Sequence, residues 1–195
     1  MNLFNLQHGY YVRAAEGYPT GGDAAIVYES SSHWFYVVID VLGHGFEATY
    51  ERARIEASIT QYLYTDLQQS IDDINSRFAD SRGFALGILT IEKSSGWAEY
   101  VSIGNTVCRI ISDKEEKFYS NDGIVGQYKR SINIQKHKMP QEGFVFLYSD
   151  GVSESAPLSI HSHLFLQSPT KIAKTIVEDL GKPYDDACCI VIKLG

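Results

Sequence analysis

Apolar residues occur along this chain in short runs that are rich in β-branched and aromatic side chains and are separated by polar turns. Runs of this length and composition are typical of strands that are buried in a sheet. We therefore predict strands over residues 5–15, 23–30, 34–41, 84–91, 98–103, 106–111, 132–135, 143–148 and 187–193.

Two other segments carry apolar residues at a spacing near 3.6, which predicts helices. The first helix is expected over residues 47–69, and Ser70 is expected to cap a further helix that follows it. The last helix is expected over residues 170–180, because Gly181 and then Pro183 provide a stop signal.

Three short turns divide the middle of the chain, namely Ser94–Gly96, Gly104–Asn105 and Asp113–Lys114. Each is typical of a hairpin between neighbouring strands. The resulting order of strands, helices, hairpin strands, a helix and a strand predicts an α+β fold in which helices cover antiparallel sheets. A length of 195 residues suits one domain with a substantial core.

The charge of the chain narrows the classes of partner. A net charge of −7 argues against nucleic acid, since proteins that bind nucleic acid present a basic face. A membrane helix needs about 20 apolar residues, and no apolar stretch of the chain approaches this length. The N-terminus lacks a signal-peptide pattern. We therefore expect a cytoplasmic protein with no membrane partner. The cysteines are expected to be reduced core residues, with Cys188 and Cys189 on opposite faces of a strand and Cys108 elsewhere in the core.

Four aspartates stand in short turns spread along the chain: Asp23, Asp40, Asp150 and Asp185. Three of them touch the end of a predicted strand, so their carboxylates can converge at one edge of a sandwich. Converging carboxylates must bind a hard cation or lose their charge, because like charges at close range do not all stay ionised. Aspartate-only ligation favours manganese or magnesium over zinc. Each aspartate taken alone also fits an ordinary turn, and only the combination predicts a site.

The motifs around these aspartates follow a recognisable order. They are Gly22-Asp23, the Asp-x-x-Gly-His-Gly of 40–45, the Ser-x-Gly-Asn of 102–105, the Ser-Asp-Gly of 149–151, and Asp185-Asp186. This ordered set resembles the metal-dependent protein phosphatase family (PPM, protein phosphatase 2C-like). The Asp-x-x-Gly-His-Gly variant resembles its bacterial SpoIIE/RsbX branch. The small size of the chain, without a sensor domain, is most similar to the stressosome phosphatases of that branch.

The resemblance implies a four-layer α-β-β-α sandwich of two antiparallel sheets flanked by helices, formed as a single phosphatase domain over residues 1–195. It also implies two Mn²⁺ or Mg²⁺ ions at one end of the sandwich. Asp40 would bridge both ions. The remaining ligands would be Asp150 and Asp185 on one ion, and Asp23 and the carbonyl of Val41 on the other.

A phosphoprotein is the substrate that the resemblance implies. Two cations lower the pKa of a bridging water, and the resulting hydroxide attacks the phosphorus of phosphoserine or phosphothreonine while the cations neutralise the phosphoryl oxygens. The cations would also attract phosphate to a chain that is itself acidic. The resemblance further implies that phosphorylated stressosome scaffold proteins are the substrates, so that activity resets a stress signal and restrains an alternative sigma factor.

Three residue assignments stay open at this point. Asp186 replaces Asp185 as the ligand if the register shifts by one residue. His44 loosely matches the histidine that is proposed as a proton donor in the family, and it also suits packing in the turn. The arginine that helps to hold phosphate in the wider family has no counterpart at the usual place, since Arg13, the nearest candidate, lies ten residues upstream of Asp23.

Two other functions fit the same motifs. The chain would be a non-catalytic binding module if it kept the fold and took up no manganese. It would be a hydrolase of a small phosphorylated metabolite if it preferred small phosphate esters to phosphopeptides.

Two polar features have ordinary explanations. The pair His161 and His163, with His33 and His137 elsewhere, lacks the further ligands that a zinc site needs. A basic stretch could guide a phosphorylated partner, but an ordinary solvated edge is the favoured interpretation; its members are Lys129, Arg130, Lys136 and Lys138.

Overall fold

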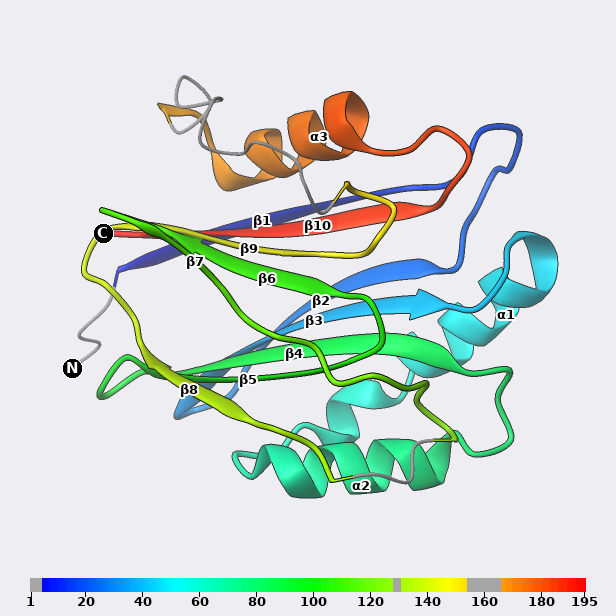
Figure 1. The fold of residues 1–195 in the computed structure, drawn as a ribbon, viewed down its shortest axis with the longest axis horizontal. Coiled ribbons are helices and arrows are strands. Elements are labelled where there is room, and N and C mark those ends of the chain that lie inside the picture. Colours follow the sequence, from blue (N-terminus) through cyan, green and yellow to red (C-terminus); the bar gives the residue numbers. More distant parts are fainter. Residues whose placement is uncertain (1–4, 128–130, 154–165) are drawn as a thin grey trace.

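The computed structural model describes residues 5–127, 131–153 and 166–195. Two five-stranded sheets pack face to face, and helices cover their outer faces (Figure 1). The paired strands of both sheets run antiparallel. This four-layer α-β-β-α arrangement confirms the fold class that the sequence predicted.

The first sheet has the order β1-β10-β9-β6-β7. Its strands are β1 (Leu6–Arg13), β10 (Ala187–Leu194), β9 (Gly143–Tyr148), β6 (Val107–Ile111) and β7 (Glu115–Lys117). Helix α3 (Pro169–Leu180) packs on the outer face of this sheet against β1 and β10. Gly181 ends this helix, as the stop signal predicted.

The second sheet has the order β2-β3-β4-β5-β8. Its strands are β2 (Asp23–Glu29), β3 (His33–Val41), β4 (Phe84–Glu92), β5 (Trp97–Ile103) and β8 (Gln135–Lys138). Its outer face is covered by helices α1 (Gly45–Glu56) and α2 (Leu67–Arg77), with a short 3₁₀ turn, η1 (Ile59–Tyr62), between them.

Central strands of both sheets are buried on two faces, which explains why they appear in the sequence as continuous apolar runs. On β3, Tyr36 points into the core between the sheets, and its neighbour Val37 points into the core beneath α1 and α2. On β10, Cys188 lies between the sheets and Cys189 lies beneath α3. All three cysteines are buried and form no disulfide, so the predictions of reduced core cysteines and of opposite faces are confirmed.

The prediction of a helix over residues 47–69, followed by a second helix capped by Ser70, is wrong in its boundaries and in its cap. The chain leaves α1 after Glu56 and begins α2 at Leu67, where the Asp66 carboxylate accepts the N–H groups of Gln68 and Gln69 at 2.9 and 3.2 Å. Ser70 lies inside α2, buried, and its hydroxyl accepts the Tyr64 N–H at 2.9 Å. The apolar spacing does not reveal this break because both helices turn their apolar faces to the same sheet.

The expected hairpin at Gly104–Asn105 is also wrong, because β5 and β6 belong to different sheets. The chain crosses here from one layer to the other, and the hydroxyls of Ser102 and Thr106 meet across the crossing at 2.6 Å. Gly104 has φ +98°, and a Cβ there would lie 2.6 Å from the Cβ of Ala85, so a glycine is needed. The other two turns do join paired strands, β4 to β5 and β6 to β7.

Two edge strands differ from the prediction. Strand β8 covers Gln135–Lys138 rather than 132–135, and β7, which follows the predicted turn at Asp113–Lys114, had been given no range of its own. Both consist largely of charged and polar residues, as edge strands often do, so neither carries an apolar signal.

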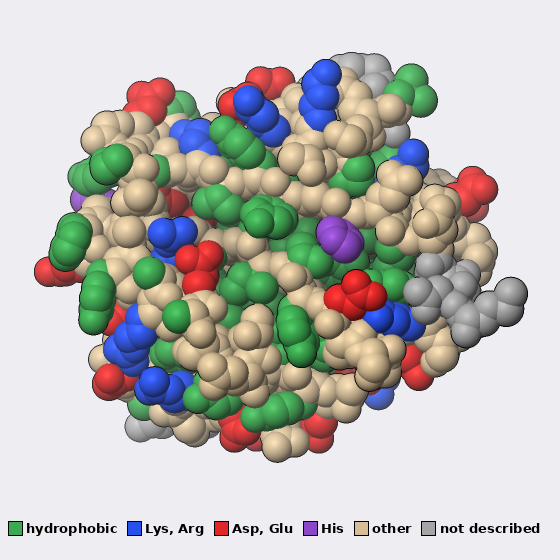
Figure 2. Space-filling model, turned by 180° about the vertical axis from the view of Figure 1, so that it is seen from behind, with side chains coloured by type: hydrophobic (Ala, Val, Ile, Leu, Met, Phe, Trp, Pro, Cys, Tyr) green, Lys and Arg blue, Asp and Glu red, His purple; other side chains and the backbone are tan. Residues whose placement is uncertain are grey.

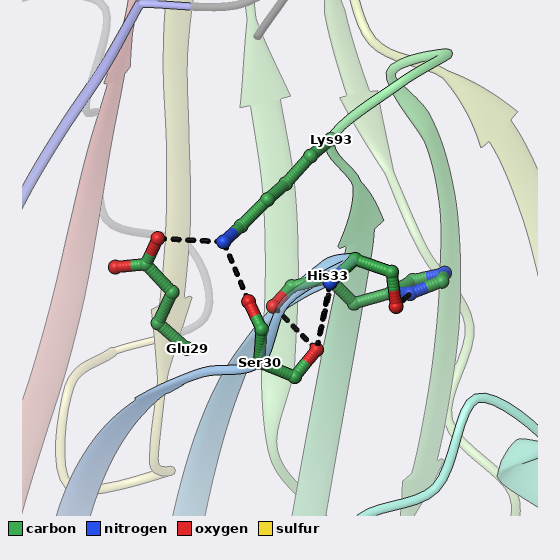
Figure 3. A network of polar contacts seen from close by, with 5 residues as sticks. Glu29, Ser30, His33 and Lys93 are labelled. Atoms are coloured by element: carbon green, nitrogen blue, oxygen red, sulfur yellow. Dashed lines mark hydrogen bonds and ion pairs between the residues drawn. The ribbon is translucent and has the colours of Figure 1, made fainter. Parts of the chain in front are cut away.

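A polar network closes the turn between β2 and β3 and ties it to the end of β4 (Figure 3). The Ser30 hydroxyl accepts the His33 N–H at 3.0 Å. The Lys93 ammonium donates to a Glu29 carboxylate oxygen at 2.6 Å and to the Ser30 carbonyl at 2.5 Å. We call Glu29, Ser30, His33 and Lys93 the distal network, because Asp23 and Asp40 lie at the other end of the same two strands.

The surface shows no separation of charge on the face opposite to that of Figure 1. Figure 2 shows acidic and basic side chains interspersed with hydrophobic ones across this face. Among the described residues, no helix has both the length and the apolar character needed to cross a bilayer.

Candidate metal centre

Two of the four aspartates face each other on neighbouring strands of the second sheet. Asp23 opens β2, Asp40 lies near the end of β3, and the two are direct partners in the antiparallel register. Side chains at such positions have Cβ atoms about 4.5–5.5 Å apart, and like charges there destabilise the pair. Asp23 is only 2% exposed, so water does little to screen this repulsion.

The other two aspartates come from the first sheet. Asp150 follows β9 and Asp185 precedes β10, and these two strands are paired. Their loops are joined by a hydrogen bond of 2.7 Å from the Lys182 N–H to the Gly151 carbonyl. A Cβ on Gly151 would lie 1.8 Å from the Asp186 carbonyl oxygen, which explains the glycine after Asp150. The end of β3 and the start of β10 lie at the same end of the sandwich, to the right in Figure 1.

These carboxyls influence one another's ionisation. Burial is the largest of the causes that raise the pKa of Asp40 to about 9, and the charges of Asp23, Asp150 and Asp185 and a hydrogen bond with Asp150 are the others. Burial raises the pKa of Asp23 to about 7 against the lowering effect of the Ser149 hydrogen bond, with the nearby carboxylates adding to the rise. Burial and the charge of Asp150 also raise the pKa of Asp185. The structure therefore brings together the four aspartates that the sequence singled out.

Two polar side chains hold these carboxylates in place. The buried Ser149 hydroxyl donates to Asp23 at 2.5 Å and accepts the Cys188 N–H at 3.0 Å. The Asn105 amide donates to Asp150 at 2.7 Å. Both residues belong to motifs that the sequence displayed, Ser-Asp-Gly and Ser-x-Gly-Asn, but their partners are 126 and 45 residues away and no local signal identifies them.

Asp186 has a different environment from Asp185. Its two oxygens accept the backbone N–H groups of Ala15 at 2.8 Å and Gly22 at 2.7 Å, and the residue is buried. It thus joins the start of β10 to the segment between β1 and β2, directly beside Asp23. Because both oxygens are engaged, this geometry favours Asp185, which is partly exposed, as the ligand of a cation.

The remaining predicted site residues lie around this centre. A Cβ on Gly22 would lie 3.1 Å from the Val41 carbonyl oxygen, so this oxygen faces the residue that precedes Asp23. His44 is exposed at the start of α1, and its ring lies 5.2 Å from the Tyr18 ring, a contact that fits packing in the turn. Its catalytic role stays a prediction.

Arg13 stabilises a loop of the centre. Its Nη2 donates to the Lys182 carbonyl at 2.7 Å, and the same carbonyl accepts the Asp185 N–H at 3.2 Å. Arg13 therefore helps to position the loop that carries Asp185.

The donor set fits a hard divalent cation in type and place. Several carboxylates and a nearby carbonyl supply the oxygen ligands that magnesium and manganese prefer, and the repulsion that raises their pKa values is what a cation would relieve. In the described part of the chain, no three His, Cys, Asp or Glu side chains already stand as a formed metal shell. An ion bound here would have to draw these carboxylates closer together.

The histidines and lysines that the sequence set apart lie away from this centre or outside the described residues. His33 lies in the distal network, and His137 on β8 is 3.5 Å from Glu116. On the same edge strand, Lys136 pairs with Glu99 at 2.6 Å. Four of the set lie outside the described residues: Lys129, Arg130, His161 and His163.

The chain matches the family model of Stage II sporulation protein E (SpoIIE) over residues 30–195. The chain belongs to the SpoIIE family. It is 24% identical over 203 residues to the Stage II sporulation protein E of Priestia megaterium, an alignment that covers 91% of this chain and 34% of that protein. The chain thus spans about a third of the length of this curated relative.

Solved structures share the fold. A chain from a structure of the bacterial stressosome, described as a modular system adapted to control secondary messenger signaling, superposes with a TM-score of 0.87 at 26% identity, over 96% of this chain and 99% of that chain. The structure of RsbX in complex with magnesium superposes with a TM-score of 0.83 at 20% identity, and the match covers 100% of this chain and 98% of that chain. The catalytic domain of the serine threonine protein phosphatase PstP with 2 manganese ions superposes with a TM-score of 0.72 at 13% identity, over 98% of this chain and 99% of that chain. The family that the motifs indicated is thereby confirmed, together with its fold.

Proposed function

We propose that this chain is a metal-dependent serine/threonine phosphoprotein phosphatase, folded as one domain over residues 1–195 and acting in the cytoplasm. The observation that carries the proposal is the meeting of four aspartates from two sheets at one end of the sandwich, with Asp23 and Asp40 directly opposite each other. Buried carboxylates that repel one another cost stability, and groups with strongly perturbed pKa values cluster at functional sites.

The residues have separate roles in this proposal. Asp40 would be the ligand common to two Mn²⁺ or Mg²⁺ ions, Asp150 and Asp185 would hold one of them, and Asp23 and the Val41 carbonyl would hold the other. When bound, the ions supply a water of low pKa and neutralise the phosphoryl group.

The surrounding residues orient these ligands. Ser149 keeps one oxygen of Asp23 occupied, which would leave the other oxygen available to an ion. Arg13 and Asp186 fix the backbone that presents Asp185 and Asp23. The site needs no basic residue to attract phosphate, because bound ions would reverse the negative charge of the aspartates.

We further propose that the substrates are phosphorylated stressosome scaffold proteins, and that their dephosphorylation resets a stress signal and restrains an alternative sigma factor. The similarity to a stressosome chain over nearly its whole length, and to RsbX, supports this substrate class.

Hydrolysis of phosphoserine and phosphothreonine peptides, with manganese and with a chelator, tests the activity. We expect manganese-dependent phosphate release that Asp40→Ala and Asp150→Ala each abolish. Asp113→Ala is the matched control, because Asp113 is an exposed aspartate in the turn between β6 and β7. Retained activity in both site variants would refute the proposal.

Two further measurements separate the alternatives. A chain that takes up no manganese in calorimetry is a binding module, and a chain that prefers small phosphate esters to phosphopeptides acts on a metabolite. For the substrate class, we expect phosphorylated scaffold to lose phosphate faster than an unrelated phosphoprotein. The reverse order would refute the scaffold assignment.

A further inference from the structure

A cleft of about 540 Å³ opens beside the candidate metal centre, and one candidate ligand, Asp150, forms part of its wall. Its size falls within the roughly 300–1,000 Å³ of clefts that hold ligands. Lys182, in the loop between α3 and β10, lines the same cleft and brings a positive charge to it. A phosphoryl group that reached the candidate metal centre through this cleft would come close to an ammonium.

The Lys182 ammonium already has a partner, which is a second candidate ligand. Its Nζ lies 4.0 Å from an Asp185 carboxylate oxygen, at the outer limit of an ion pair. Burial and the charge of Asp150 raise the pKa of Asp185, and Lys182 offsets only part of this rise. The two paired side chains are 34% and 42% exposed, so the pair contributes little stability and can be exchanged for a stronger one.

The backbone of Lys182 is held independently of its side chain. Its N–H donates to the Gly151 carbonyl at 2.7 Å, and its carbonyl accepts from Arg13 Nη2 at 2.7 Å and from the Asp185 N–H at 3.2 Å. Pro183 follows and disfavours the helical conformation at Lys182. All of these contacts would persist with another side chain at position 182, so the shape of the loop does not explain the lysine.

Arg13 is a second cation of this loop, but its guanidinium supports the loop. Besides its bond to the Lys182 carbonyl, its Nη2 packs close to Gly181, where an added Cβ would lie 2.9 Å from it. The guanidinium of Arg13 is therefore committed to the backbone of the loop, whereas the ammonium of Lys182 lines the cleft.

A lysine beside a site for divalent cations carries an electrostatic cost. An ion bound by Asp185 would repel the nearby ammonium and would take up the negative charge that Lys182 now faces. A phosphoryl group, with about two negative charges at pH 7, attracts both cations and so removes this cost. Bound ions are sufficient to attract the group, and an ammonium to one side adds a directed hydrogen bond to one of its oxygens.

We propose that Lys182 contacts the substrate: its ammonium leaves Asp185 and donates to a phosphoryl oxygen when the phosphoryl group lies at the metal centre. This rests on the proposed function, and it adds a residue that recognises the phosphoryl group. Because the contact is with the phosphoryl group and not with the flanking sequence, it serves every phosphoserine or phosphothreonine peptide alike.

Calorimetry with inorganic phosphate and magnesium-loaded protein tests the contact without any need for hydrolysis. We expect Lys182→Met to raise the Kd of phosphate by about 3- to 10-fold, and Lys182→Arg, which keeps the charge, to restore most of the affinity. Wild type that binds no phosphate, or a Lys182→Met variant with the wild-type Kd, would overturn the proposal.

Lys174→Met is the matched control. Lys174 is an exposed lysine on α3 that pairs with Glu178 at 3.6 Å, and it is not among the described residues that line the cleft. This variant should keep the wild-type phosphate Kd.

Magnesium affinity separates substrate contact from structural support. Without phosphate, Lys182→Met should bind magnesium as tightly as wild type or slightly more tightly, because the variant lacks a cation that repels the ion. Weaker magnesium binding in Lys182→Met would mean that the lysine only positions Asp185, and the contact with phosphate would be rejected.

Two phosphoserine peptides, one with glutamates and one with glutamines around the phosphorylated residue, test the independence from sequence. Lys182→Met should lower kcat/KM by the same factor on both peptides. A fall confined to the acidic peptide would show that Lys182 binds flanking carboxylates instead.

The phosphate measurement also keeps this proposal separate from the proposed function. A protein that hydrolyses neither peptide, but whose phosphate Kd depends on Lys182, retains the lysine contact and loses the phosphatase assignment. An active protein whose phosphate Kd is the same in Lys182→Met loses only the lysine contact.

Discussion

The two ends of the hairpin formed by β2 and β3 differ in how their charged side chains are arranged. At the distal end, Glu29 receives the Lys93 ammonium and the Ser30 hydroxyl closes the turn (Figure 3). At the other end, Asp23 and Asp40 face each other without a basic partner between them, and carboxylates from the first sheet add to the repulsion. One end has opposite charges in contact, and the other gathers like charges.

Within this single hairpin, the charges at one end suit stability and the charges at the other end suit function. A paired charge near the surface makes a small contribution to stability and needs no ligand. A group of buried like charges lowers stability until a cation arrives, and such sites persist where activity needs them. The end of the hairpin that carries Asp23 and Asp40 is joined to the loops of the first sheet through Ser149 and Asp186.

Removing Asp40 should have the largest effect. Asp40→Asn is expected to lower metal-dependent kcat/KM by at least about a hundredfold, since each 1.36 kcal/mol of lost transition-state stabilisation is a factor of ten. In thermal unfolding, wild type should gain roughly 5–10 °C at a manganese concentration of 100 times Kd. The variant should gain almost nothing.

The same variant should be more stable than wild type when a chelator is present, because it removes a buried carboxyl whose ionisation the folded state resists. Asp113→Asn is the control, and it should behave as wild type in both conditions. A variant that is less stable without metal and still responds to manganese would show that Asp40 is an ordinary structural residue.

The stability of chelator-treated protein should fall as pH rises. The folded-state pKa values of Asp23 and Asp40, about 7 and about 9, lie above the usual 3.8, so the folded state binds protons more tightly than the unfolded state. Their contribution is complete below pH 3.8 and is lost as pH rises through 7 and then 9. Urea unfolding from pH 5 to 9 measures this loss. Asp40→Asn should show a shallower fall, and equal slopes would contradict the prediction.

The adjacent residues Asp185 and Asp186 should give opposite results. Asp186→Asn is expected to lower the free energy of unfolding by about 1–3 kcal/mol, because one of the two backbone N–H groups that Asp186 accepts is left unsatisfied. Asp185→Asn should leave stability without metal unchanged or slightly raised, and should weaken manganese binding. Urea unfolding and calorimetry measure the two effects, and an exchange of the two outcomes would make Asp186 the ligand.

The distal network should give the smallest effect. Lys93→Met keeps an unbranched apolar side chain and removes the ammonium, which pairs with Glu29 and lies 5.2 Å from the centroid of the Trp34 ring, so we expect a loss of about 1 kcal/mol. Metal-dependent activity should not change. A clear loss of activity would show that the two ends of the hairpin are coupled.

The sequence by itself determined the layers and the family. Strands such as β3 and β10 are apolar on both faces, so their composition alone indicates burial in a sandwich. The short motifs around Asp23, Asp40, Asp150 and Asp185 were sufficient to indicate a metal centre. These motifs are recognisable in the sequence because each forms a short turn, so its residues are close together along the chain.

Only the tertiary structure decided the partners. The break between α1 and α2 depends on Asp66 as a cap, and the crossing at Gly104 depends on which sheet receives β6. The separation of Asp185 from Asp186 depends on two N–H groups that lie 171 and 164 residues from Asp186 along the chain. A local stretch of sequence indicates which secondary structure its residues prefer and how their apolar positions repeat. These contacts depend instead on how the layers pack against one another, which a local stretch does not specify.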